Sequence, residues 1–349
     1  MTNEVLFSVL DNGLASITLN RPEAIHSLSY QMVKEIGTVL KEWETDDRVQ
    51  VVVIKGAGER GLCAGGDMKQ LYMNRTKKSF LQMVKQYFEE EYRTDLAVYQ
   101  FPKPIIACLD GIVMGGGVGL TYGASHRIVT ERTKWAMPEM DISFFPDVGA
   151  AYFLNKAPGY SGRYLALTSS IIGAADVLYI KGADIYMNSD NLASFLTHLE
   201  KVNWHDASIH SQLASLISQY ENTLSIEENS KLMQFREQID RHFSNNSMEE
   251  IIASLAKDNS RFAEETKKTL LSVSPTSLKV TLKHLIAGEK MSLQACLEKD
   301  VTLALNFATF ADFFEGVRSV LIDKDRNPQY QYKRLEDVSD ELVDSFFKQ

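Results

Sequence analysis

The sequence predicts an α/β fold in which a core of alternating strands and helices, residues 1–190, is followed by a helical region, residues 191–349. Two apolar runs, Val49–Ile54 (polar only at Gln50) and Ile105–Leu109, have the pattern of strands that are buried on both faces of a sheet. Extended runs alternate with helical patterns up to about residue 190, which favours an α/β core. Beyond Asn191, the apolar residues recur at helical spacing.

The first elements are predicted to be a hairpin and a helix. Asp11-Asn12-Gly13 separates two extended apolar runs within residues 5–19, and Asn-Gly at such a place is a strong hairpin signal. Ser27 or Ser29 can cap the helix expected over residues 30–43, because a serine side chain accepts hydrogen bonds from the amides of a first helical turn.

The rest of the core is predicted as a long helix, a buried strand, a short helix and two further strands. The long helix ends before Pro102, because a proline disfavours helical backbone in the residue that precedes it. These elements are expected over residues 80–99, 105–109, 118–122, 127–130 and 134–137.

The C-terminal region is predicted to consist of successive helices. Ser274-Pro275-Thr276 interrupts them, and Thr276 or Ser277 is the expected cap of the helix that follows. The helices are expected near residues 192–201, 207–220, 230–242, 248–256, 261–272, 277–286, 292–306 and 311–322.

Composition excludes several classes of partner. The net charge of −9 argues against nucleic acid, and it requires that any anionic ligand be held by local cations or N–H groups. There is no run of 18 apolar residues, so no membrane partner is expected. The N-terminal residues lack a secretory or transit pattern, which leads us to expect a cytoplasmic protein or a mature form already trimmed.

The cysteines and histidines give no metal or disulfide pattern. Cys63, Cys108 and Cys296 lie far apart, which favours a reducing compartment and no disulfide framework. The histidines are scattered, so metal catalysis is not expected. Residues 56–61 match GxGxxG, but another glycine turn follows where a dinucleotide site needs a helix, so we interpret them as a surface loop.

Two glycine loops are the main functional signal. Cys63–Asp67 and Asp110–Gly117 each follow a predicted strand, and the second precedes a helix. Backbone N–H groups at such places are free to bind an anion or a polarised carbonyl, which predicts a two-donor oxyanion hole. The triple glycine at 115–117 also has a simpler interpretation, a tight turn or close packing of a helix on a strand.

Two acidic residues follow these loops. Glu139 comes after Pro138 and can do acid–base or nucleophilic work on a carbonyl, although a single glutamate at such a place is usually solvated. Asp147 precedes Val148-Gly149, and its simpler interpretation is an N-cap of the next helix.

Taken together, these motifs resemble the enoyl-CoA hydratase/isomerase (crotonase) superfamily. The matching segments, in order, are Leu19–Glu23, Cys63–Asp67, Asp110–Gly117, Met137–Glu139 and Phe314–Arg318. The resemblance implies a crotonase-like spiral of ββα units with an extended helical C-terminal region, and an acyl-CoA thioester as the substrate. It also implies an oxyanion hole formed by the N–H groups of Gly66 and Gly116.

Within that superfamily the chain is similar to the 3-hydroxyisobutyryl-CoA hydrolases. Hydratases carry a glutamate at the position of Gly119, whereas at Asp147 they usually have glycine. Further similarity covers Glu90–Tyr92, Ser274–Lys279 and Val320–Asp325. His26-Ser27 and Ala150-Ala151 depart from the usual pattern, in which asparagine and further glycines stand at these places.

This resemblance implies hydrolysis of a short 3-hydroxyacyl-CoA, either 3-hydroxyisobutyryl-CoA or 3-hydroxypropionyl-CoA. Glu91, Gly116, Glu139 and Asp147 would line the substrate site, and Glu139 and Asp147 would be catalytic. Coenzyme A is part of the substrate, so no separate cofactor is expected. The alternatives are an isomerase or hydratase-like lyase of the same fold, and a non-catalytic scaffold subunit. The sequence leaves open whether the protein forms a homo-oligomer.

Overall fold

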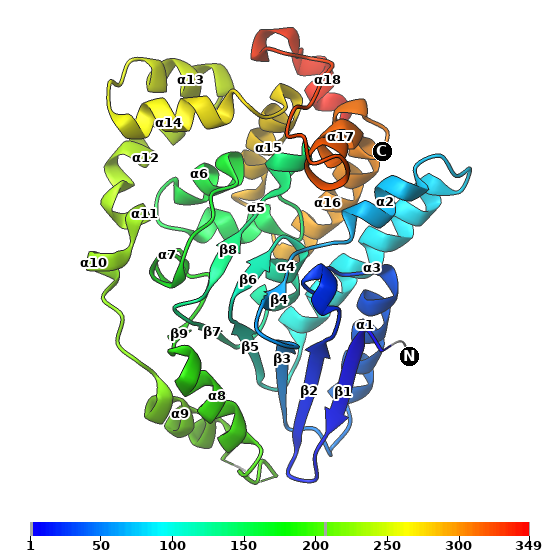
Figure 1. The fold of residues 1–349 in the computed structure, drawn as a ribbon, viewed down its shortest axis with the longest axis vertical. Coiled ribbons are helices and arrows are strands. Elements are labelled where there is room, and N and C mark those ends of the chain that lie inside the picture. Colours follow the sequence, from blue (N-terminus) through cyan, green and yellow to red (C-terminus); the bar gives the residue numbers. More distant parts are fainter. Residues whose placement is uncertain (1–2, 206–207, 349) are drawn as a thin grey trace. The chain divides into compact units, whose positions relative to one another are not determined.

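The computed structural model describes residues 3–205 and 208–348. The chain forms two compact units, each assembled from separate stretches of sequence (Figure 1). Unit 1 contains Met1–Gly66, Glu90–Trp135 and Ile172–Ser230, and unit 2 contains Asp67–Glu89, Ala136–Ile171 and Lys231–Gln349.

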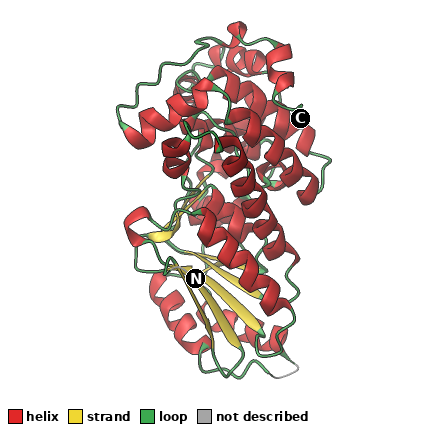
Figure 2. Ribbon diagram, turned by 90° about the vertical axis from the view of Figure 1, so that its right-hand side faces the viewer, coloured by secondary structure: helices red, strands yellow, loops and turns green. Residues whose placement is uncertain are grey.

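Unit 1 is built on strands in two sheets (Figure 2). In the larger sheet, β1 is antiparallel to β2, and β2, β3, β5, β7 and β9 are parallel. The smaller sheet has the order β4-β6-β8. The strands are β1 Val5–Val9, β2 Leu14–Leu19, β3 Val51–Gly56, β4 Gly61–Cys63, β5 Ile105–Leu109, β6 Ile112–Met114, β7 His126–Val129, β8 Lys134–Ala136 and β9 Ile185–Tyr186.

Successive strand pairs repeat one arrangement along the chain. The pairs β3/β4, β5/β6 and β7/β8 each contribute one strand to the larger sheet and one to the smaller sheet. A helix follows β4 and another follows β6, so the order of elements agrees with the implied ββα units. The α/β prediction is therefore confirmed.

A buried apolar core joins the larger sheet to two helices of unit 1. Side chains such as Val53 and Ile106 pack with Phe195 of α8 and Leu213 of α9. Trp204, fully buried, donates a 2.9 Å hydrogen bond from its ring N–H to Leu199 O. Each such side chain contributes about 1.5–3 kcal/mol by burial. The helices of unit 1 are α1 Tyr30–Glu44, α4 Gly116–Tyr122, α7 Ala174–Tyr179, α8 Ser189–Leu199, α9 Ile209–Tyr220 and α10 Ile226–Asn229, with η1 Pro22–Ala24.

Helix α3, Phe80–Gln100, begins in unit 2 and continues in unit 1, and the other elements of unit 2 are also helical. Figure 1 shows α13 and α14 side by side. These elements are α2 Met68–Asn74, α5 Ala150–Phe153, α6 Ser161–Thr168, α11 Lys231–Gln234, α12 Arg236–Phe243, α13 Met248–Ala256, α14 Arg261–Leu270, α15 Pro275–Gly288, α16 Leu293–Phe307, α17 Ala311–Val317 and α18 Asp340–Ser345, with the 3-10 helices η2 Glu139–Ile142, η3 Leu154–Lys156 and η5 Leu335–Asp337 and the π-helical turn η4 Arg318–Ile322.

Three expectations about the helices need correction. Ser274, rather than Thr276 or Ser277, caps α15, because Pro275 can occupy the first helical position without losing a hydrogen bond. The helix expected over 230–242 is divided at Phe235 into α11 and α12. The helix expected over 311–322 becomes π-helical from Arg318.

Other expectations can be compared directly with the structure. Residue 207, the first of the helix expected over 207–220, lies outside the described residues. The predicted boundary at residue 190 follows the last described strand, β9, but as a domain boundary it stays a prediction. Among residues 3–205 and 208–348, no helix is long and apolar enough to cross a bilayer.

Candidate active site

The first glycine loop follows β4 and is held by the chain that leads into α1. The Leu28 N–H donates to Gly65 O at 2.8 Å, and the Ala64 N–H donates to Ile25 O at 2.9 Å. Gly65 has φ +103°, which side chains disfavour. These bonds fix the residues beside Gly66, so the loop is held without using the Gly66 amide.

The second glycine loop begins α4. Gly115 is the N-cap at φ 50°, and its carbonyl accepts a 2.8 Å hydrogen bond from Val118 N–H. Gly116 and Gly117 lie in the first turn, where amides have no intrahelical acceptor and the helix end is positive. A Cβ on Gly117 would lie 2.6 Å from Cys63 Cβ. Gly117 is therefore explained by close packing of the helix on a strand, which was the simpler interpretation of the triple glycine.

The two loops meet at Gly66 and Gly116. A Cβ atom built on Gly116 would lie 3.3 Å from Gly66 N, and one built on Gly65 would lie 3.6 Å from Gly116 N. The Gly116 Cβ would also lie 2.4 Å from Oε1 of Glu91, a side chain of α3 that is 2% exposed. Unit 1 thus brings together Gly66, Gly116 and Glu91, which are 25 or more residues apart in the sequence.

His26, noted as a departure from the family pattern, anchors this region. Its Nδ1 accepts from Arg21 N–H at 2.9 Å, so the proton is assigned to Nε2, which lies 2.9 Å from Ala57 O. The His26 carbonyl accepts from the Cys63 thiol at 3.2 Å. Burial lowers the pKa of His26, which favours the neutral ring that these partners require.

We predict that His26 makes the stability of the protein depend on pH. The unfolded chain takes up a proton near pH 6.5, whereas the folded chain resists it, so the free energy of unfolding falls as pH decreases below 6.5. The slope from this residue is at most about 1.4 kcal/mol per pH unit. Urea unfolding of wild type and His26→Gln at pH 8 and pH 5.5 measures this effect. The difference in the free energy of unfolding between the two proteins should be smaller at pH 5.5 than at pH 8. The same difference at both pH values would contradict the prediction.

In unit 2, Glu139 begins the 3-10 helix η2 and is 6% exposed, so it is not a solvated surface glutamate. Its carbonyl accepts from Phe144 N–H at 3.0 Å, which closes the turn. Helix α17 packs closely on the end of η2, because a Cβ on Gly316 would lie 2.3 Å from Ile142 O. The motif near the C-terminus, Phe314–Arg318, therefore supports the element that carries Glu139.

Asp147 lies in a tight turn of unit 2 and is 5% exposed. Its carbonyl accepts from Ala150 N–H at 2.8 Å, and the two residues between them, Val148 and Gly149, have φ of 50° and 79°. A left-handed conformation is strained for β-branched valine, at a cost of about 1–3 kcal/mol. Helix α5 has Gly149 as its N-cap without a side-chain bond, which excludes the interpretation of Asp147 as that cap.

Ala150 and Ala151, which replace glycines of the usual family pattern, are accommodated by packing within unit 2. Both alanines are fully buried. A Cβ on Gly288 of α15 would lie 2.7 Å from Ala151 Cβ, so α15 has a glycine where α5 has the alanine.

Nucleophilic cysteine chemistry is not supported. Burial raises the pKa of the thiols of Cys63, Cys108 and Cys296 to about 12, so each is protonated at neutral pH. All three are free and buried. Within the described residues, no cluster of three or more His, Cys, Asp or Glu side chains is suited to hold a metal ion.

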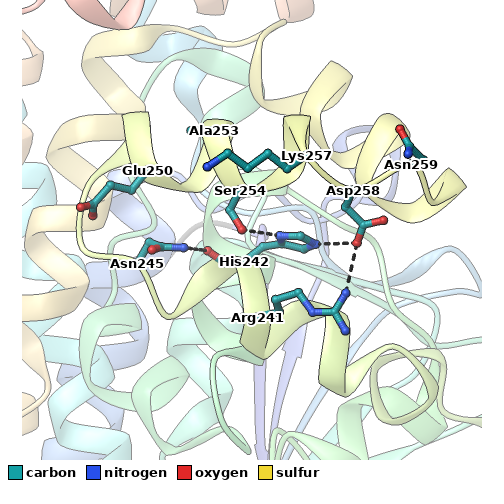
Figure 3. A pocket seen from close by; sticks show the side chains of 9 residues that line it. All are labelled: Arg241, His242, Asn245, Glu250, Ala253, Ser254, Lys257, Asp258 and Asn259. Carbon is teal, nitrogen blue, oxygen red and sulfur yellow. Dashed lines mark hydrogen bonds and ion pairs between the residues drawn. The ribbon is translucent and has the colours of Figure 1, made fainter.

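A separate polar pocket in unit 2 contains a serine, a histidine and an aspartate (Figure 3). Ser254 Oγ lies 2.8 Å from His242 Nδ1, and Asp258 Oδ2 lies 3.1 Å from Nε2. Ser254 lies inside α13, where the neighbouring amides are used by the helix and cannot stabilise an oxyanion. These bonds connect α12 to α13 and to the segment that follows it, and we assign the cluster a structural role.

Comparison with known proteins gives close and nearly complete matches. The family model described as enoyl-CoA hydratase/isomerase matches residues 14–347. The curated "3-hydroxyisobutyryl-CoA hydrolase, mitochondrial" of Gallus gallus is 40% identical over 338 residues, which cover 96% of this chain and 86% of that protein. The Danio rerio protein of the same name is 40% identical over 347 residues, covering 99% and 89%.

The solved structures include a match along the whole chain. The crystal structure of a carnitinyl-CoA dehydratase from Mycobacterium thermoresistibile has a TM-score of 0.91 and 33% identity, and the match covers 100% of this chain and 97% of that one. The predicted crotonase-like fold is thereby confirmed.

The expected cytoplasmic location is wrong. The curated relatives are named as mitochondrial proteins. The cytoplasmic expectation rested in part on cysteine usage, which does not distinguish one reducing compartment from another.

Proposed function

This chain belongs to the enoyl-CoA hydratase/isomerase family, and we propose that it hydrolyses 3-hydroxyisobutyryl-CoA to the free acid and coenzyme A. One observation carries chemistry on an acyl carbonyl: the loops of Gly66 and Gly116 meet, as two N–H donors to one carbonyl oxygen must. The acyl group follows from the name shared by curated relatives that are 40% identical over nearly the full chain.

In the proposed reaction, the thioester carbonyl oxygen accepts hydrogen bonds from the N–H groups of Gly66 and Gly116. The carbonyl carbon becomes more electrophilic, and the negative charge that develops on oxygen is stabilised by about 3–4 kcal/mol per donor. The C–S bond breaks when the tetrahedral intermediate collapses, and the CoA thiolate leaves and takes a proton. The substrate carries CoA itself, so the reaction needs no separate cofactor.

Glu139 acts either as the nucleophile or as the general base. Its carboxylate adds to the carbonyl carbon and forms a mixed anhydride that water cleaves, or it removes a proton from the water that attacks. A single turnover in ¹⁸O-labelled water tests the anhydride route: label in the Glu139 carboxyl group requires an anhydride in which water attacks the Glu139 carbonyl carbon, and the water route cannot produce it.

Asp147 is proposed to hold the 3-hydroxyl of the acyl group or the attacking water, and Glu91 is proposed to bind the same hydroxyl or to orient Glu139. Asp147→Asn is expected to lower kcat on 3-hydroxyisobutyryl-CoA about 100-fold, the scale of a positioned acid–base group. Isobutyryl-CoA, which lacks the 3-hydroxyl, is the matched substrate. A loss confined to the hydroxylated substrate assigns Asp147 to the hydroxyl, and an equal loss on both assigns it to water. Unchanged turnover of both would remove Asp147 from either role.

An isomerase or lyase of the same family is the second candidate. It is favoured by the dehydratase name of the solved structure that matches the whole chain. It is disfavoured by Gly119, which stands where the hydratases of this superfamily carry a glutamate.

Release of free thiol decides between these candidates. The wild-type protein should release CoA thiol from 3-hydroxyisobutyryl-CoA faster than from crotonyl-CoA or carnitinyl-CoA. Conversion of an acyl-CoA without thiol release would replace the hydrolase proposal with a lyase or isomerase. No affinity for any CoA ester by calorimetry would instead favour a scaffold.

A further inference from the structure

The turn that carries Asp147 has a backbone that must be held in place. Val148 and Gly149 both have left-handed φ values, and a β-branched residue adopts this conformation rarely. Such a conformation persists only where the surrounding structure over-determines it. The residues that fix this turn therefore control where the Asp147 carboxyl group points.

One fixing contact comes from a distant helix of the same unit. Asp300 of α16 is fully buried, and its Oδ2 accepts a 2.8 Å hydrogen bond from Gly149 N–H, across 151 residues of sequence. A buried carboxyl group in this role is unusual, because a neutral side chain could fill the space without the cost of desolvation. Leu293, on the same helix, also touches this position: a Cβ on Gly149 would lie 2.4 Å from Leu293 Cδ1.

The second carboxyl oxygen of Asp300 binds His284 of α15. His284 Nε2 lies 2.7 Å from Asp300 Oδ1, and His284 is 1% exposed. The same ring packs edge-on against Phe145, with centroids 5.7 Å apart and an interplanar angle of 86°. His284 and Asp300 therefore contact the chain two residues before and two residues after Asp147.

We propose that the His284–Asp300 pair is a positioning device for Asp147 and so sets the preference for acyl groups that carry a 3-hydroxyl. The proposal rests on the proposed function and, within it, on the role in which Asp147 binds that hydroxyl. Asp300 fixes the carboxyl-terminal side of the turn through the Gly149 amide, and His284 holds both Asp300 and the amino-terminal side. The proposed role of both residues is to position Asp147, without binding the substrate.

The test compares Asp300→Ala with Asp300→Asn. Alanine removes both hydrogen bonds, whereas the amide of asparagine can accept from Gly149 N–H and donate to the other tautomer of His284. The readout is the ratio of kcat/KM for 3-hydroxyisobutyryl-CoA to kcat/KM for isobutyryl-CoA. We expect Asp300→Ala to lower this ratio about 10-fold or more, since small misplacements of a reacting group can cost up to about 100-fold. Asp300→Asn should stay near wild type.

A matched control exists in the same unit. His242 is also 1% exposed and bonded to an aspartate, Asp258, but this pair joins α12 to the segment between α13 and α14. Asp258→Ala should leave the ratio unchanged. If it lowers the ratio as much as Asp300→Ala, general loosening of unit 2 explains the result and the proposal is overturned.

Amide hydrogen exchange of segment 144–150 provides a readout that does not need turnover. Exchange at Gly149 should accelerate in Asp300→Ala and not in Asp258→Ala. If wild type releases no thiol, the proposed function fails, while this measurement still decides whether the pair holds the turn. Should Asp300→Ala not fold, His284→Leu replaces it, because leucine cannot donate a hydrogen bond to Asp300, and it should lower the ratio and speed exchange. Wild-type exchange and ratio in a folded Asp300→Ala or His284→Leu variant would overturn the proposal.

Discussion

Replacing Glu139 with glutamine is expected to lower kcat on 3-hydroxyisobutyryl-CoA about 1,000-fold, within the range of 10²–10⁴ for a positioned acid–base group. Glutamine keeps the shape of the side chain, but its amide neither attacks a thioester nor removes a proton from water. Both proposed routes lose their key group. KM should change little, because the CoA portion and the two glycine amides are untouched.

Thiol release at saturating substrate measures this effect, and thermal unfolding shows whether the variant is folded. Glu35→Gln is the matched control: Glu35, in α1, is also 6% exposed, and it accepts a hydrogen bond from Gln31. Its kcat should equal that of wild type. A folded Glu139→Gln variant with full kcat would exclude Glu139 from both routes.

The long elements of the fold were predictable because each has a signal of its own. The continuous apolar run Ile105–Leu109 is β5, and Ser29 accepts from Met32 N–H at the start of α1, as expected of a cap. Helix α13 has the predicted bounds, 248–256. In each case a local pattern of several residues agrees with the burial that the fold imposes.

The short elements were not predictable in this way. Strands β4 and β6 have three residues each, too few to show a period of two. Helices α5 and α7, with four and six residues, are defined by their packing in the fold rather than by an amphipathic pattern. The site loops lie beside these short strands. The glycines themselves indicated a two-donor site, but the pairing of Gly66 with Gly116 came from the resemblance to a family.

The residues that support the site were missed for a different reason. Gly66, Gly116 and Glu139 stand in recognisable motifs, and they were assigned to the site because they occupy the matching positions of the family's motifs. Asp300 and His284 lie in ordinary helical sequence, where one polar residue on a helix is usually exposed. Gly316 stood in a noted motif, but its close approach to Ile142 O is a property of the folded unit. Contacts between distant segments have no local signal.

Replacing Gly116 with alanine is expected to lower kcat/KM about 100- to 1,000-fold, the cost of losing one oxyanion donor. Alanine has a higher helix propensity than glycine, so the helical backbone at residue 116 is compatible with the substitution. The added methyl group would lie 2.4 Å from Glu91 Oε1 and 3.3 Å from Gly66 N. Glu91 is 2% exposed and has little room to move, so the start of α4 must shift and the methyl group also covers the Gly66 amide.

Gly173→Ala is the matched control in the same unit. Gly173 precedes α7 with φ −98°, and the only atom within 4 Å of a Cβ built there is Thr133 O, at 4.0 Å. This variant should keep wild-type kcat/KM, measured by thiol release, together with its thermal stability. The fall in Gly116→Ala should be larger for kcat than for substrate affinity, because the two amides act most strongly on the charge of the transition state. Full kcat/KM in a folded Gly116→Ala variant would mean that the thioester oxygen is not bound where Gly66 and Gly116 meet.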